Sequence, residues 1–152
     1  MNTVFSTVSV QSPEYAELRK FVDELFSAWS TDTGQVDYEA IGRFYSKDPE
    51  NVFYVPMPPL GGYKGWHNFR NGIEKNLFIS VSKFRLTAKD DLQLWRKDEV
   101  AWGTFTFNFF KTNIDKQVTE FEARMTAIFE QRNGQWLLVH EHVSTPLSQN
   151  TA

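Results

Sequence analysis

The feature that most limits the fold of this chain is a change of hydrophobic spacing near its middle. Apolar residues first recur three or four positions apart, as in Leu18, Val22, Leu25 and Trp29, which is the spacing of one face of an α-helix. From about Phe84 onward they alternate with polar residues, which is typical of half-buried strands. Helices first and long strands afterwards indicate a segregated α+β fold rather than a parallel sheet with crossover helices.

Three helices are expected in the first half. The first begins at Ser12-Pro13, because Ser is a good N-cap and Pro is tolerated in the first helical turn. Asp37 can cap a short second helix, and Asp48-Pro49 prevents that helix from continuing. The third helix has apolar residues at the same spacing: Trp66, Phe69, Ile73 and Leu77.

The strands are expected to form an antiparallel meander. A short strand at residues 52–55 is followed by a Pro- and Gly-rich run at residues 56–62. The loop over residues 56–65 can act as a lid over the pocket mouth or simply connect two elements. The long strands are predicted from residue 83 to beyond residue 94, and over residues 100–110, 118–131 and 135–144. Together with the helices they predict one compact α+β domain, in which three helices pack against a strongly curved antiparallel sheet with a ligand-sized pocket between the two layers.

Asn133-Gly134 is the strongest turn signal in the chain and predicts a two-residue type I′ hairpin. This turn pairs Arg132 with Gln135. Counting back from that pair, an uninterrupted ladder places Arg124, Thr126 and Ile128 opposite Val143, Glu141 and Val139. Because side chains alternate across a strand, Arg124, Thr126, Glu141 and Val143 are expected on one face, with Arg124 and Glu141 as diagonal neighbours.

A second hairpin, centred on Ile114, adds Trp102 and Thr104 to that face by placing Thr104 opposite Arg124. A sheet face with an Arg, a Glu, threonines and a Trp suggests the wall of a ligand cavity. The opposite face carries Phe105 and Phe107, and is expected to be a dry contact surface against another protomer or against the ends of the chain.

Composition excludes several classes of function. Aromatic residues make up 16% of the 152 residues, which suits a large core, a cavity or an interface. A net charge of −3 without a basic run argues against nucleic acid binding. There is no Cys for disulfides or thiolate sites, and neither a signal peptide nor an apolar run that could span a membrane is evident. A cytoplasmic location is therefore expected.

Two interpretations stay open for several of the candidate site residues. Arg124 and Glu141 can contact a ligand, with Glu141 as a possible base, or form a structural ion pair. Trp102, Tyr54 and Trp29 can line the pocket or simply fill the core. His140 and His142 suggest interface or core histidines rather than a metal site, because zinc needs three or four ligands.

Several segments together resemble the SnoaL-like group of the nuclear transport factor 2-like, or ketosteroid isomerase-like, superfamily. They are residues 45–54, Val100-Ala101-Trp102, Arg124-Met125-Thr126, Gly134-Gln135-Trp136 and residues 140–146. The resemblance covers about residues 13–146 and implies a single domain over residues 1–152 with a cystatin-like cone, an apolar pocket and a homodimer through the sheet. The last two strands are also similar to the association domain of calcium/calmodulin-dependent protein kinase two.

The catalytic residues of ketosteroid isomerases do not carry over. The resemblance implies an Asp base just before the Pro that follows the first strand, where this chain has Val55 before Pro56. It implies oxyanion donors in the first helix and the penultimate strand, where this chain has no tyrosine around Leu25 and has Thr126. An enolising enzyme needs both a base and such donors, so steroid isomerisation by that apparatus is not expected.

Three functions are compatible with the sequence. The first is binding of a small, largely apolar ligand with a polar or anionic end, without a cofactor or metal. Its contacts are expected from Arg124, Trp102, Thr104, Thr126, Tyr54, Ile128, Val139, Val143 and Trp29. The second is an isomerase, cyclase or dehydratase acting on a hydrophobic carbonyl compound with Glu141 as base. The third is an oligomerisation module.

Overall fold

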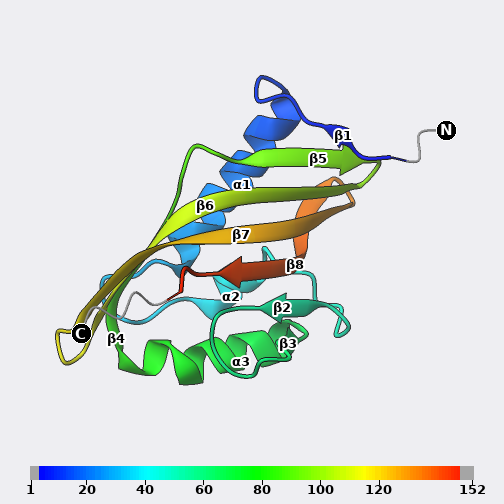
Figure 1. Ribbon diagram of the computed structural model, residues 1–152. Helices are drawn as coiled ribbons and strands as arrows, with labels where there is room; N and C mark the ends of the chain where they lie inside the picture. The colour runs from blue at the N-terminus through cyan, green and yellow to red at the C-terminus, as the bar shows by residue number, and fades with distance from the viewer. Residues whose placement is uncertain (1–3, 148–152) are drawn as a thin grey trace.

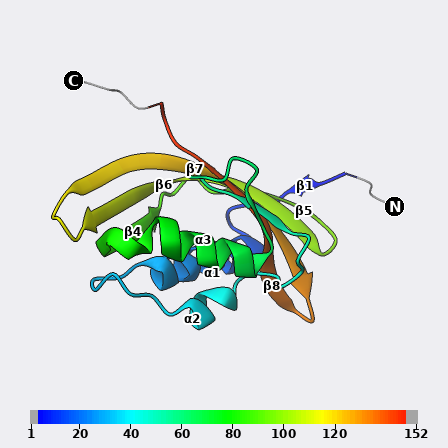
Figure 2. The same ribbon diagram turned by 90° about the horizontal axis from the view of Figure 1, so that it is seen from below.

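The computed structural model describes residues 4–147. In it, a strongly curved sheet arches over three helices (Figure 1, Figure 2). The helices are α1 (Pro13–Trp29), α2 (Tyr38–Gly42) and α3 (Trp66–Asn76), and a 3₁₀ turn, η1, covers Phe78–Ser80. The α+β class and the helix layer are confirmed.

The predicted caps hold the two N-terminal helices. The Oγ atom of Ser12 accepts a hydrogen bond from the backbone N–H of Tyr15 at 3.2 Å, with Pro13 in the first turn. The carboxylate of Asp37 accepts bonds from the first backbone N–H groups of α2. These caps satisfy donors that a helix leaves without partners at its start.

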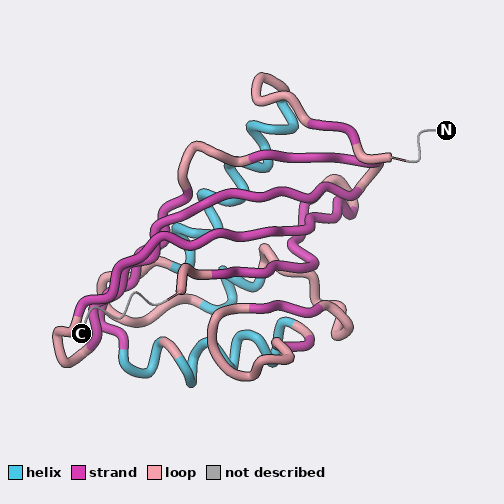
Figure 3. The backbone as a smooth tube through the Cα atoms, in the orientation of Figure 1, coloured by secondary structure: helices cyan, strands magenta, loops and turns pink. Residues whose placement is uncertain are grey.

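The sheet has eight strands and is mixed. The strands are β1 (Ser6–Thr7), β2 (Val52–Tyr54), β3 (Tyr63–Lys64), β4 (Val81–Ala88), β5 (Gln93–Lys97), β6 (Val100–Asn113), β7 (Val118–Arg132) and β8 (Gln135–Ser144). Their order is β1-β5-β6-β7-β8-β2-β3, with β4 paired to β6. Only β2 and β8 are paired in parallel. Figure 3 shows β6 and β7 running the length of the sheet.

The long strand predicted from residue 83 to beyond residue 94 is two strands. Both β4 and β5 pair with β6, but they pair with different halves of it. Between them, the carboxylate of Asp91 accepts a hydrogen bond from the backbone N–H of Thr106 at 2.9 Å. This side-chain bond takes a β6 donor that a continuous strand would have used, so the strand is broken there.

The type I′ turn is confirmed, but the ladder beyond it contains an extra residue. Asn133 and Gly134 have φ values of 53° and 76°, and Arg132 pairs with Gln135 as predicted. Phe129 pairs with Leu138, whereas Ile128 pairs with His140, so Val139 has no partner opposite it. This β-bulge shifts the rest of β8 by one residue, and a shift of one residue moves every later side chain to the other face.

The predicted sharing of a face by Arg124 and Glu141 is therefore wrong. Glu141 pairs with Ala127 and turns toward the helices, while Arg124 pairs with Ser144 on the outer face. The hairpin near Ile114 is also shifted, because Thr104 pairs with Thr126 rather than with Arg124. That shift is two residues, and it leaves the faces of β6 unchanged.

The Phe-rich face is the inner face of the sheet, which corrects the expectation of a dry contact surface. Phe105, Phe107 and Phe129 are buried against the helices, and the ring of Phe26 in α1 lies 5.1 Å from that of Phe107. Truncating one such aromatic to Ala typically costs about 3–5 kcal/mol. No helix of residues 4–147 lies on the outer face (Figure 2).

Candidate functional site

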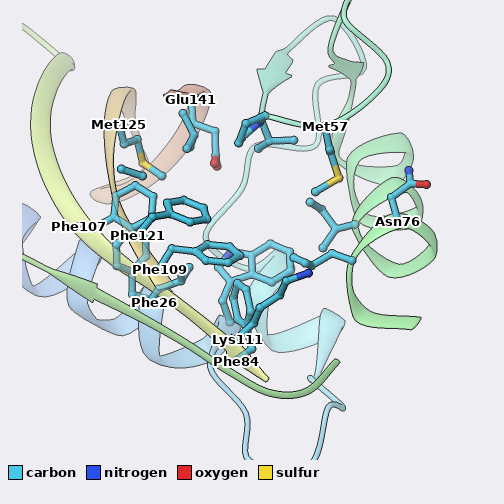
Figure 4. A pocket seen from close by; sticks show the side chains of 18 of the residues that line it. Phe26, Met57, Asn76, Phe84, Phe107, Phe109, Lys111, Phe121, Met125 and Glu141 are labelled. Carbon is cyan, nitrogen blue, oxygen red and sulfur yellow. The ribbon is translucent and has the colours of Figure 1, made fainter. Parts of the chain in front are cut away.

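A cavity of about 360 Å³ lies between the inner sheet face and the helices, within the usual size range of ligand pockets. Its wall is mostly apolar (Figure 4). The aromatic residues that line it are Phe26, Trp29, Tyr45, Phe69, Phe84, Phe107, Phe109 and Phe121. Pro56 and Met57, from the loop after β2, also line it, which agrees with the location expected for a lid.

Glu141 is the one acidic side chain that lines this cavity within the described residues. Only 4% of Glu141 is exposed, and it is the single charged residue among the buried residues of 4–147. The hydroxyl of Tyr45 donates a hydrogen bond to its Oε1 atom at 2.6 Å, and the indole N–H of Trp29 donates to that hydroxyl at 3.3 Å. Its Oε2 atom has no hydrogen-bond partner within the described residues.

Three elements position this chain of hydrogen bonds. The bulge in β8 turns Glu141 inward. Trp29 is the last residue of α1, and Tyr45 follows α2, where its ring stacks on Trp66 with centroids 4.6 Å apart. Tyr45 is itself 2% exposed, so packing and hydrogen bonds together hold its hydroxyl against the carboxyl group.

Burial changes the acidity of both partners. Loss of hydration raises the pKa of Glu141 from 4.5 to about 7, and the hydrogen bond from Tyr45 offsets part of that rise. The pKa of Tyr45 is raised well above 10, first by burial and then by the nearby carboxylate. A carboxyl group with a pKa near neutrality can accept or release a proton at physiological pH.

The remaining polar side chains of the cavity come from other elements. Lys111 lies on β6 and Thr119 opposite it on β7. Asn76 is the last residue of α3, and its Nδ2 atom donates to the hydroxyl of Tyr63 at 3.0 Å. Neither Lys111 nor Tyr45 was expected at the site. The alternation Phe105-Phe107-Phe109-Lys111 could have indicated Lys111 once the inner face was known, and Tyr45 carries only the helical spacing of a core residue.

Three of the predicted site residues line the cavity: Glu141, Val143 and Trp29. Six others lie outside it on the outer sheet face: Arg124, Trp102, Thr104, Thr126, Ile128 and Tyr54. Val139 is the unpaired residue of the bulge and does not line the cavity. A ligand inside the cavity would thus meet different residues from those expected. The Phe-rich face of β6 and β7 is the inner one, and the bulge in β8 places Glu141 and Val143 on that same inner face.

The outer-face residues have partners of their own. The guanidinium Nε of Arg124 donates to the hydroxyl of Ser144 at 2.9 Å. Trp102 stacks on Trp95 with centroids 4.0 Å apart. The ring of Tyr54 lies 5.3 Å from that of His142. These side chains form a half-exposed aromatic and polar surface away from the helices.

No helix within residues 4–147 has the length and apolar character needed to cross a membrane.

Solved structures show the same fold at low sequence identity. A nuclear transport factor 2-like superfamily protein from Salmonella enterica serovar Typhimurium superposes with a TM-score of 0.71 and 19% identity, covering 91% of this chain and 97% of the other. An NTF2-like protein of unknown function from Pseudomonas putida superposes with a TM-score of 0.67 and 18% identity, covering 90% of this chain and 89% of the other.

A third similar structure is hexachlorocyclohexane dehydrochlorinase LinA-type3 from Novosphingobium barchaimii, with a TM-score of 0.67 and 15% identity, covering 87% of this chain and 88% of the other. Comparison with curated protein sequences gives no match.

The sequence itself matches the profile of the SnoaL-like domain over residues 22–148. That span includes α2, α3 and every strand from β2 to β8, and hence both Tyr45 and Glu141. This chain belongs to the SnoaL-like domain family.

Proposed function

We propose that this domain binds a small, largely apolar molecule in the cavity, with a hydrogen-bonding group of that molecule against Oε2 of Glu141. One observation carries the proposal: a buried carboxyl group with a single hydrogen-bond donor faces a mostly apolar cavity. A few fixed polar groups in an apolar wall are typical of small-molecule sites.

A purely structural role for Glu141 has little support. The ion pair with Arg124 that would have explained its burial is absent, because Arg124 lies on the other face. Burying a carboxyl group without a cation is unfavourable, and Tyr45 supplies one hydrogen bond in return. A ligand that hydrogen-bonds to the second carboxyl oxygen would supply the contact that the protein does not provide.

The test is the content of the cavity in native protein. Small molecules extracted after native purification are identified by mass spectrometry for the wild type and for Met57→Trp, whose larger side chain should occupy the cavity from the loop after β2. Leu60→Trp is the matched control, because Leu60 lies in the same loop and is 98% exposed. A molecule bound to the wild type and to Leu60→Trp, but lost from Met57→Trp, supports the proposal. Equal retention by all three proteins contradicts it.

A second candidate is catalysis of proton transfer with Glu141 as general base. The specific observation is its pKa of about 7, which suits a base at neutral pH. A dehydrochlorinase is among the similar structures. The steroid isomerase apparatus is not matched, because Val55 lines the cavity where that base would lie and Thr126 is on the outer face.

This candidate can be tested without a known substrate. Hydrophobic ketones such as 2-tetralone are incubated with the protein in D₂O, and deuterium entry at the carbon next to the carbonyl is followed by NMR. Enzyme-dependent exchange that Glu141→Gln removes and Glu17→Gln keeps would support the base. Exchange that is unaffected by Glu141→Gln would reject it. Glu17 is an exposed residue of α1 and serves as the control.

We also propose that two copies pair through the outer sheet face. That face carries the stacked Trp95 and Trp102 and a half-buried Ile128, and none of the helices between residues 4 and 147 covers it. Light scattering after size exclusion should give a dimer for the wild type and a monomer for Ile128→Arg. Ile114→Arg, in the exposed β6–β7 turn, should remain dimeric. A wild-type monomer would refute the pairing.

A further inference from the structure

One cation in the cavity wall has no counter-ion. Among the lining residues in the described part of the chain, Lys111 is the only positively charged side chain and Glu141 the only negatively charged one. Lys111 is half-buried, and its side-chain ammonium forms no ion pair or hydrogen bond with any of residues 4–147. The nearby Glu122 is on the outer face, where it pairs with Lys89.

The two charged groups belong to opposite ends of the cavity. Glu141 is level with Ala127 of β7, which pairs with Gly103 of β6. Lys111 lies eight residues further along β6, and eight residues of straight strand span about 26 Å. Even with the curvature of the sheet and the reach of both side chains, these groups are not partners of one another. Figure 4 shows them on opposite walls.

The wall between these ends is apolar and aromatic. Phe107 and Phe109 are the inward residues of β6 before Lys111, and the ring of Phe109 stacks on that of Phe121 with centroids 4.5 Å apart. Phe84, which pairs with Lys111, packs edge-on against Phe109. A ligand that touches both ends must therefore carry an elongated apolar body.

Charge decides the orientation of such a ligand. An anionic group beside Glu141 would face a second carboxyl group, which is unfavourable whenever Glu141 is ionised. At the other end the same group would meet an ammonium that lacks a partner, and a charge-assisted hydrogen bond is among the stronger polar contacts. An anion is thus favoured at Lys111 and a neutral polar group at Glu141.

Resting on the function proposed above, we infer that the ligands of this site are elongated carboxylic acids with an aromatic or aliphatic body. The carboxylate lies against Lys111, the body lies along Phe109 and Phe121, and the far end approaches the chain of hydrogen bonds between Trp29, Tyr45 and Glu141. Lys111 acts as a specificity-determining residue in this arrangement.

The experiment compares a carboxylate with its neutral analogue. Binding of 6-phenylhexanoate and of 6-phenylhexanamide is measured by calorimetry at pH 7.5 for wild type, Lys111→Met and Lys83→Met. Methionine keeps the length and apolar stem of lysine without its charge. Lys83 is the matched control, because it lies on the outer face of β4 over the ring of Phe110. Circular dichroism establishes that each variant is folded.

The wild type and Lys83→Met should bind the carboxylate about five- to tenfold more tightly than the amide, and Lys111→Met should lose that preference while it still binds the amide. If Lys111→Met keeps the preference, or if the wild type shows none or binds neither probe, the inference is overturned. The proposed function is decided separately, by the molecules that native wild type retains and Met57→Trp loses.

Discussion

The buried carboxyl group predicts an unusual dependence of stability on pH. A group whose pKa is raised on folding holds its proton to a higher pH in the folded protein than in the unfolded chain. Between about pH 4.5 and pH 7 the folded protein therefore binds more protons through Glu141, and the free energy of unfolding falls as pH rises. Below this window the contribution is fully present, and above it the loss is complete.

The size of the effect follows from the two pKa values. The interval from 4.5 to about 7, at 1.36 kcal/mol for each pH unit, corresponds to about 3 kcal/mol. Glu141→Gln should remove this dependence, because an amide has the same shape, cannot ionise and still accepts the hydrogen bond from Tyr45. Relative to the wild type, the variant should gain about 3 kcal/mol of stability between pH 4.5 and pH 8.

Urea unfolding followed by fluorescence at a series of pH values measures this difference directly. Subtracting the two curves cancels the other titrating groups that the proteins share. Glu17→Gln, an exposed glutamate of α1, is the control and should change the curve by less than about 0.5 kcal/mol. The reasoning is refuted if the curves of wild type and Glu141→Gln run parallel from pH 4.5 to pH 8.

Two other predictions concern Tyr45 and the glycine turns. Tyr45→Phe removes the donor that holds down the pKa of Glu141, so the fall of the urea stability curve with pH should extend to higher pH, and an unchanged curve would contradict the role of that bond. Gly34→Ala should destabilise the protein more than Gly134→Ala in the same assay. Both glycines have a positive φ, but a Cβ at Gly34 would lie 2.1 Å from the backbone oxygen of Val81, whereas a Cβ at Gly134 would meet open space. Equal losses would show that the loop at Gly34 adapts.

Local signals in the sequence were sufficient to predict the helices and the turn at Asn133-Gly134. The Ser12 cap, the three- and four-residue spacings and Asn133-Gly134 each depend on neighbours in the chain, and the corresponding helices and hairpin are confirmed. The break between β4 and β5 depends on a bond between Asp91 and Thr106. These residues are fifteen positions apart, and no periodicity reveals such a bond.

The site was harder to predict because each side chain of a strand points to one of only two sheet faces, so an error of one residue in the register places it on the wrong face. One unpaired residue in β8 is enough to place Arg124 and Glu141 on opposite faces, whereas an uninterrupted ladder places them on the same face. The inward residues of β8 change their spacing at the bulge: Trp136 and Leu138 are two positions apart, whereas Glu141 follows Leu138 after three. The inner face could have been identified from the alternating Phe105, Phe107 and Phe129, which were instead expected on an outer contact surface.

The bulge can be tested by deleting Val139. Since Phe129 already pairs with Leu138 and Ile128 with His140, deletion should join the two correct registers, keep Glu141 inward and lose only the burial of one valine, about 1.5–3 kcal/mol. Substituting Glu141→Gln in the deletion variant should then remove the same fall in stability with pH as in the full chain. An uninterrupted ladder in the wild type predicts the reverse: Glu141 would face outward until the deletion turned it inward, so only the shortened protein would respond to the substitution. That result would refute the bulge and, with it, the placement of the carboxyl group in the cavity.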